Sequence, residues 1–149
     1  IATLDGSIRV IFEIKFLFKQ AQEILPEIDF IAPIPLHKFR IIKRKYNQAA
    51  ILAKNIAKLI DKNLILDLLV RTKNNQPQAS LNQKMRYKNV AGIFKAREKY
   101  LAKIKGKNIL LIDDVITTGA TAESCARELN KIGVNKVYVL TLAKTIANA

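Results

Sequence analysis

The chain has 149 residues, half of them hydrophobic, and its 26 Lys and Arg against 12 Asp and Glu give a net charge of +14. This size suits one domain with a core of its own, and the apolar content excludes a disordered chain, while no apolar run approaches the roughly 20 residues of a membrane span and no secretory signal is present. The one cysteine, Cys125, cannot form an internal disulfide or a structural zinc site, so we expect a cytoplasmic protein.

The first part of the chain predicts two helices separated by a strand and a loop. Residues 8–25 are strongly apolar with scattered charges, and we predict a helix there. A short buried strand at 28–33 is broken by prolines and followed by a basic loop at 36–45. Residues 47–60 form an amphipathic pattern typical of a helix. The apolar positions of that pattern are Ala49, Leu52, Ala53, Ile56, Ala57 and Ile60.

The middle of the chain is more polar and predicts short elements. Residues 65–70 form a second strand candidate. Residues 72–80 are polar, contain a proline and lack periodicity, which indicates a mobile loop. Ser80 is a suitable N-cap for a short helix through residue 87, and residues 90–94 predict another strand.

The last part of the chain alternates strand, helix and strand. Residues 107–112 are apolar without interruption, which is typical of a parallel strand buried on both faces. A helix at 121–132 follows, with Gly133 as its C-cap, and a strand at 137–142 comes last. This alternation predicts an α/β fold with a mostly parallel central sheet covered by helices on both faces.

We expect a single domain over residues 1–149, made of a helical N-terminal segment at 1–27 and a core at 28–149. Because the chain begins with Ile1 and not with Met, we expect an N-terminal part to be missing. No internal repeat and no low-complexity linker divides the chain further.

The positive charge is concentrated in two stretches. Residues 30–60 and residues 68–97 each contain seven bases and no acid. Such stretches favour an anionic partner, either a nucleic acid or a small phosphorylated substrate. Compositional drift in a chain rich in Ile, Lys and Asn explains the overall charge equally well, so we assign function only to particular bases in loops.

The stretch ILLIDDVITTGAT, residues 109–121, places two adjacent acids at the end of a buried strand. Ligands of open α/β sheets bind beyond the carboxyl ends of the strands. Gly119 lets the backbone approach a ligand closely, and the start of the following helix favours an anion. We therefore expect a phosphate in the turn at 118–121 and a sugar diol on Asp113 and Asp114, which together describe a ribose 5-phosphate.

The sequence fits several alternative interpretations less well. A two-component receiver domain needs a further Asp, but the acids after Asp114 are Glu123 and Glu128. The glycine patterns of nucleotide-binding P-loops and of dinucleotide-binding folds are absent. A buried acid pair satisfied by local N–H groups stays open, although it makes poor use of two charges.

The stretch at 109–121 closely resembles the signature of type I phosphoribosyltransferases, which has four apolar residues, two acids and a phosphate loop of small residues. This resemblance implies binding of phosphoribosyl pyrophosphate with magnesium. It implies that Asp113 and Asp114 hold the ribose hydroxyls, carry the catalytic function and bind magnesium, directly or through water. The implied ribose 5-phosphate loop consists of Thr117, Thr118, Gly119, Ala120 and Thr121.

Two further segments resemble the ComF family, which is related to bacterial competence proteins. They read IAPIPLHKFRIIKRKYNQAAILAKNIAKLI at 31–60 and LVRTKNNQPQASLNQKMRYKNVAGIF at 69–94. Lys45 replaces a glycine of the family's pattern, which changes the turn there. The resemblance extends from residue 31 to about residue 143. The family's cysteine-rich zinc module is absent from this sequence, so the resemblance implies no zinc.

The resemblance also implies a pyrophosphate site and a closing lid. The loop after the first strand, with Pro35, Leu36 and His37, is where the fold meets pyrophosphate, although His37 fits an ordinary loop histidine as well. Arg71 and Arg86 match the family pattern and would neutralise the leaving pyrophosphate, and residues 72–86 occupy the place of the lid. Purine-salvage members carry an Asp where this chain has Thr117, which argues against hypoxanthine or guanine as acceptor.

Two functional hypotheses follow. The first is an enzyme that moves a phosphoribosyl group from phosphoribosyl pyrophosphate to an unidentified acceptor. The second is a DNA-uptake module of the same fold that uses the site for a nucleotide or a 5-phosphate end and binds single-stranded DNA. Both are compatible with a homodimer, and neither needs a membrane span.

Overall fold

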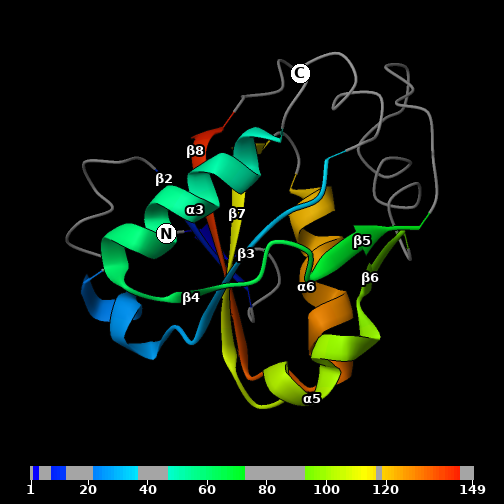
Figure 1. Cartoon of the computed structure of the whole chain (residues 1–149). Coiled ribbons are helices and arrows are strands. Elements are labelled where there is room, and N and C mark those ends of the chain that lie inside the picture. Colours follow the sequence, from blue (N-terminus) through cyan, green and yellow to red (C-terminus); the bar gives the residue numbers. More distant parts are fainter. Residues whose placement is uncertain are drawn as a thin grey trace, which may run out of the picture.

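The computed structural model describes residues 2–3, 8–12, 22–36, 47–72, 93–116 and 119–144. Within these residues the centre is a six-stranded sheet in the order β1-β2-β8-β7-β3-β4 (Figure 1). β1 runs antiparallel to β2, and the other neighbouring strands run parallel. This arrangement confirms the predicted α/β class with a mostly parallel sheet. The strands are β1 (Ala2–Thr3), β2 (Ile8–Phe12), β3 (Phe30–Pro33), β4 (Asn63–Leu64), β7 (Asn108–Ile116) and β8 (Lys136–Lys144).

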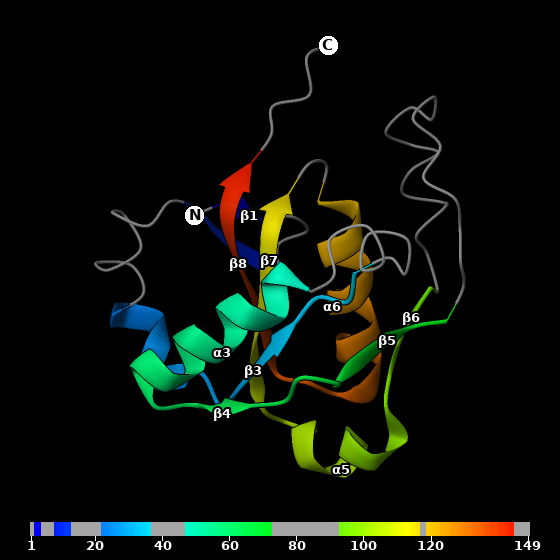
Figure 2. The same ribbon diagram turned by 45° about the horizontal axis from the view of Figure 1, so that its top comes forward.

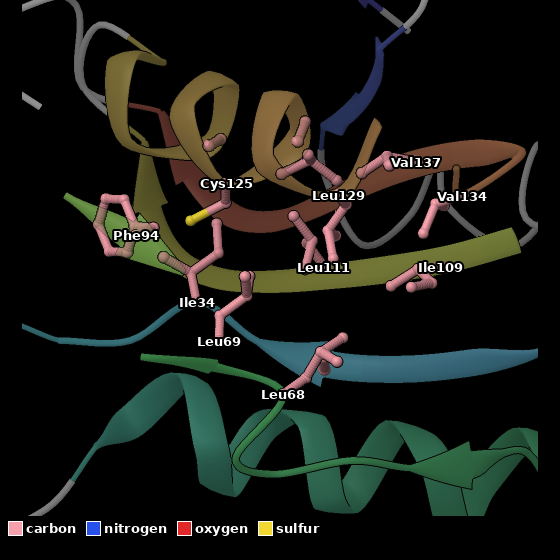
Figure 3. Packing of buried hydrophobic residues seen from close by; sticks show 14 of the residues in the cluster. Ile34, Leu68, Leu69, Phe94, Ile109, Leu111, Cys125, Leu129, Val134 and Val137 are labelled. Atoms are coloured by element: carbon pink, nitrogen blue, oxygen red, sulfur yellow. The ribbon is translucent and has the colours of Figure 1, made fainter. Parts of the chain in front are cut away.

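Helices cover both faces of this sheet, as predicted. α3 (Gln48–Ile60) lies on one face and α6 (Ala120–Ile132) on the other (Figures 1 and 2). Residues of β7 alternate between the two cores, because successive side chains of a strand point to opposite faces. Ile109 and Leu111 join the cluster under α6 shown in Figure 3, whereas Leu110 and Ile112 join the cluster under α3. Both sides of the strand are therefore apolar, which is why its sequence reads as an uninterrupted apolar run.

α3 forms where its apolar periodicity predicts it. The side chain of Asn47 accepts a hydrogen bond of 3.0 Å from the backbone N–H of Ala49, which caps the first turn. Ala49, Ala53 and Ala57 are buried against the sheet, since these small side chains let the helix lie close to the strands. The predicted C-cap Gly133 of α6 is also confirmed, with φ of 100°.

A small antiparallel ribbon lies beside α6 on the same side of the sheet (Figure 2). It consists of β5 (Leu69–Arg71) and β6 (Phe94–Ala96), and its Lys95 forms a salt bridge of 3.6 Å with Glu128 of α6. The short helices η2 (Glu98–Tyr100) and α5 (Leu101–Ile104) then lead the chain to β7. The ribbon and α6 share one apolar core, so the ribbon is held against this helix.

The predicted helix at 8–25 is wrong over Ile8–Phe12, which forms β2 and pairs in parallel with β8. The sequence IRVIF is rich in β-branched and aromatic residues, which favour a strand. Its partner strand, β8, lies more than 100 residues later in the chain, so the sequence of the segment alone does not reveal the pairing. Residues 22–24 are helical and lead into η1 (Leu25–Glu27). The rest of the segment predicted as helical lies outside the described residues.

The boundaries of the other strands also differ from the prediction, by one or two residues at the ends of β3 and β8 and by more in three further places. The apolar run at 65–70 does not form one strand, because a turn at 66–68 separates β4 in the large sheet from β5 in the ribbon. β7 extends past residue 112 and through the acid pair, since residues 115 and 116 still pair with β8. The predicted strand at 90–94 overlaps β6 at Phe94, while the helix at 80–87 and all but Thr72 of the loop at 72–80 fall outside the described residues.

In the part that the structure describes, no helix is long and apolar enough to cross a membrane.

Candidate functional site

The carboxyl edge of the sheet brings the acid pair next to the end of β3. Pro33 is the register partner of Ile112, and the backbone N–H of Ile34 donates a hydrogen bond of 2.8 Å to the Ile112 carbonyl. Pro35 and Leu36 after β3, and Asp113 and Asp114 in β7, all follow this last paired level. The two segments that the sequence assigns to pyrophosphate and to ribose therefore both begin at the carboxyl edge of the sheet.

The two acids face different sides of this edge. Asp113 continues the alternation of Ile109 and Leu111 and lies on the α6 side, whereas the same alternation assigns Asp114 to the α3 side. Both residues are half-buried.

β8 contributes a polar residue at the same level. Asp113 is the register partner of Thr141, which is fully buried. The Thr141 hydroxyl donates a hydrogen bond of 3.4 Å to the backbone carbonyl of Asp114. The hydroxyl links the neighbouring strand to the acid pair and helps to fix the backbone that carries both carboxylates.

Arg71 of the ribbon lies on the α6 side of the sheet, the side that the alternation of β7 also assigns to Asp113. The Cys125 thiol is fully buried in α6, and burial raises its pKa well above the usual range. The charge of Asp113 raises this pKa further, and the charge of Arg71 lowers it. Figure 3 shows Cys125 and Phe94 at the same end of the α6-side core, and the Arg71 guanidinium carbon lies 5.4 Å from the centre of the Phe94 ring.

α6 begins at this edge with Gly119 as its N-cap. Gly119 is buried and adopts φ of 82° and ψ of 0°, a left-handed conformation that favours glycine. Its carbonyl accepts a hydrogen bond of 2.9 Å from the N–H of Glu123, and Ala120 and Thr121 form the first turn. The backbone N–H groups of a first helical turn, together with the helix dipole, suit a phosphate.

An acid in this first turn is balanced by a base. Glu123 is buried, and its carboxylate forms an ion pair with Arg127 one turn further along α6. This pairing offsets a negative charge that would otherwise oppose an anion at the helix start. The sequence shows the spacing of the pair, but it does not show that Glu123 is buried.

Four of the predicted site residues, Thr117, Thr118, His37 and Arg86, lie outside the described residues. Of the other predicted residues, Pro35 and Leu36 follow β3, Asp113 and Asp114 lie in β7, Gly119, Ala120 and Thr121 begin α6, and Arg71 lies in the ribbon. Sequence reasoning did not single out Thr141 or give a functional role to Phe94, because their significance depends on pairing between distant strands. For Phe94, the signal available in the sequence was its place in a segment that matches the ComF pattern.

The donor set at the edge suits magnesium better than zinc. Asp113 and Asp114 offer only carboxylate oxygens, and no group of three or more His, Cys, Asp or Glu gathers among the described residues. Magnesium is commonly held by one or two carboxylates together with substrate phosphates and several waters. The residues present therefore fit a magnesium ion that arrives with a pyrophosphate.

Comparisons with known proteins agree with the observed fold. The family model of the phosphoribosyl transferase domain matches residues 47–148, and the chain belongs to this family. A hypoxanthine phosphoribosyltransferase structure from Staphylococcus aureus has a similar fold, with a TM-score of 0.53 and 16% identity, covering 88% of this chain and 60% of that one. At this identity the likeness shows the fold alone.

Curated relatives narrow the family to a ComF-type protein of the phosphoribosyltransferase superfamily. The chain is 35% identical to Competence protein F from Haemophilus influenzae over 124 residues, which are 80% of this chain and 51% of that protein. It is 26% identical to DNA utilization protein YhgH from Escherichia coli over 118 residues, which are 79% of this chain and 50% of that protein. The chain thus spans about half the length of these relatives.

Proposed function

We propose that this chain binds phosphoribosyl pyrophosphate with magnesium and transfers the phosphoribosyl group to an acceptor. The supporting observation is that the acid pair and the glycine-capped start of α6 both lie on the carboxyl side of β7, while Arg71 lies on the α6 side of the sheet. A phosphate, a diol and a second phosphate group are the three parts that these features suit. Phosphoribosyl pyrophosphate contains all three in one molecule.

In this proposal each part of the edge has a separate task. The start of α6 holds the 5-phosphate through backbone N–H groups, and Asp113 and Asp114 accept hydrogen bonds from the ribose hydroxyls. Leu36 and Arg71 lie on the pyrophosphate side, where the positive charge of Arg71 stabilises the leaving group. Asp113 and Asp114 would hold a magnesium ion, directly or through water, and its positive charge would help to neutralise the leaving pyrophosphate.

The transfer breaks the bond between ribose C1 and the pyrophosphate oxygen, and the electron pair leaves with pyrophosphate. The acceptor then forms the new bond to C1. Positive charge develops on the sugar during this step, and the carboxylates of Asp113 and Asp114 near the carboxyl end of β7 would stabilise it. Exclusion of water from this centre prevents hydrolysis.

Titration calorimetry with phosphoribosyl pyrophosphate and magnesium tests this function. We expect binding by the wild type and weaker binding by Asp113→Asn and by Asp114→Asn. Asp61→Asn is a matched control, since Asp61 is the C-cap of α3 at the opposite end of the domain and asparagine tolerates its left-handed conformation. If the wild type gives no heat of binding, the proposal is contradicted. It is also contradicted if the wild type, the two site variants and the Asp61→Asn control all bind with equal affinity.

A second function, the binding of single-stranded DNA in DNA uptake, is supported by the names of the two relatives and by the net charge of +14. If the chain has this function, affinity for single-stranded DNA falls steeply as salt concentration rises, because counterions are released on binding. Fluorescence anisotropy with a labelled oligonucleotide measures this dependence. Negligible binding at low salt would exclude this second function for the chain.

A further inference from the structure

The ribbon fixes the backbone on both sides of one arginine and one phenylalanine. Arg71 ends β5 and is the register partner of Phe94, which begins β6. Just beyond this pair, the backbone N–H and the hydroxyl of Thr72 each donate a hydrogen bond of 2.7 Å to the Ile93 carbonyl. These hydrogen bonds fix the end of the ribbon next to Arg71, so the backbone positions from which the Arg71 and Phe94 side chains extend are well defined.

The Phe94 ring cannot move independently of the core. Phe94 is 1% exposed and belongs to the α6-side cluster that also contains Cys125 and Leu69 (Figure 3). A guanidinium carbon at 5.4 Å from the ring centre is within the range of a cation–π contact. A rigid ring beneath a long flexible side chain reduces the number of positions that its guanidinium can adopt.

This contact lies on the α6 side of the sheet, because Phe94 packs in the same cluster as Ile109 and Leu111 of β7, and the alternation of β7 places Asp113 on that side as well. The charges of Arg71 and Asp113 both act on the Cys125 thiol, in opposite directions. The Arg71 side chain is half-buried, so solvent screens its charge less than it screens that of a fully exposed base. The N–H groups of a guanidinium lie in its own plane, so they can bond phosphate oxygens while the face of the group rests on a ring.

We propose that Phe94 is a positioning residue, whose ring holds the Arg71 guanidinium where it receives the pyrophosphate of the bound sugar. This inference rests on the proposed function and adds a residue to it. Phe94 touches no substrate in this arrangement, and its whole effect on binding passes through Arg71. Replacing the ring therefore weakens recognition of pyrophosphate and leaves recognition of the 5-phosphate unchanged.

The test compares the wild type, Phe94→Leu, Arg71→Ala and the double variant by calorimetry, with two separate probes. The probes are inorganic pyrophosphate with magnesium and ribose 5-phosphate. From the strength of cation–π contacts, Phe94→Leu should lose about two- to thirtyfold in affinity for pyrophosphate. Its affinity for ribose 5-phosphate should equal that of the wild type, and Phe94→Leu should have no further effect when Arg71 is already alanine.

Two results would overturn the inference while the proposed function stands. In one, Phe94→Leu binds pyrophosphate as tightly as the wild type. In the second, its loss of affinity is the same with or without Arg71, which would show that Phe94 acts through packing alone. If the wild type binds neither probe, the proposed function itself fails. Circular dichroism shows whether each variant is folded, and Phe94→Met, which also removes the ring but fills space flexibly, replaces Phe94→Leu if that variant does not fold.

Discussion

The substitution Gly119→Ala, compared with a control at the other end of α6, should distinguish an effect on stability from an effect on phosphate binding. Gly119 is buried and has φ of 82°, so Gly119→Ala forces alanine into the left-handed region, at a cost of about 1–2 kcal/mol. If a phosphate binds at the start of α6 as proposed, the added carbon would obstruct its close approach to the backbone there. Hydrogen bonds to a charged group contribute about 1.5–3 kcal/mol each, so the loss of one lowers affinity about ten- to a hundredfold.

The matched control for this substitution is at the far end of the same helix. Gly133 is the C-cap of α6, has φ of 100°, and a carbon added there would lie 3.5 Å from the Lys105 Cγ, an ordinary contact. Urea denaturation should show a similar loss of stability for Gly119→Ala and Gly133→Ala. Calorimetry with ribose 5-phosphate should show weaker binding for Gly119→Ala alone. Wild-type affinity in Gly119→Ala would refute a phosphate site at this end of α6.

Three further outcomes follow from the described contacts. Cys125 is fully buried and its pKa is raised, so its thiol should react with a thiol reagent only under unfolding conditions, and rapid labelling of the native protein would contradict its burial. Hydrogen bonds from Tyr100 and Lys99 lower the pKa of Asp67 from 3.8 to about 2, so the stabilising contribution of this carboxylate is complete above about pH 4 and is lost as the pH falls towards 2. The difference in unfolding free energy between the wild type and Asp67→Asn should therefore shrink over that range, and a difference that stays constant would exclude this linkage. Leu111→Ala, at the centre of β7, should lower the unfolding free energy by about 2–5 kcal/mol in urea denaturation, and a loss below about 1 kcal/mol would mean that the core collapses around the gap.

The centre of the domain could be predicted from the sequence because its signals are local. β7 is apolar without interruption up to the acid pair, α6 has an apolar stripe and a glycine at each end, and α3 has a polar N-cap at Asn47. Each of these patterns is complete within about fifteen residues. The position of the acid pair at the carboxyl edge followed directly from the order of strand and helix.

The elements that the sequence did not predict depend on contacts between distant residues. The segment IRVIF at Ile8–Phe12 is apolar enough for a helix or a strand, and pairing with β8 decides between them. The run at 65–70 divides where Asp67 is held by Tyr100 and two bases, which belong to a part of the chain about 30 residues later. The arrangement of Arg71 above Phe94 likewise requires the antiparallel register of the ribbon.

Among the site residues, the sequence and the structure contribute different information. The sequence predicted that Asp113, Asp114 and Arg71 belong to one site, on the basis of a family resemblance. The structure adds that the two acids face different sides of β7 and that Arg71 shares the α6 side with Asp113. This difference predicts unequal effects of the two Asp→Asn substitutions, with the larger effect on pyrophosphate binding at Asp113.

Whether the carboxyl edge of this sheet binds a sugar phosphate is tested most directly by a crystal structure with ribose 5-phosphate. We predict the phosphate at the backbone of residues 119–121 and the ribose hydroxyls on Asp113 and Asp114. A phosphate bound elsewhere on the domain, or an empty edge at saturating ligand concentration, would contradict this prediction.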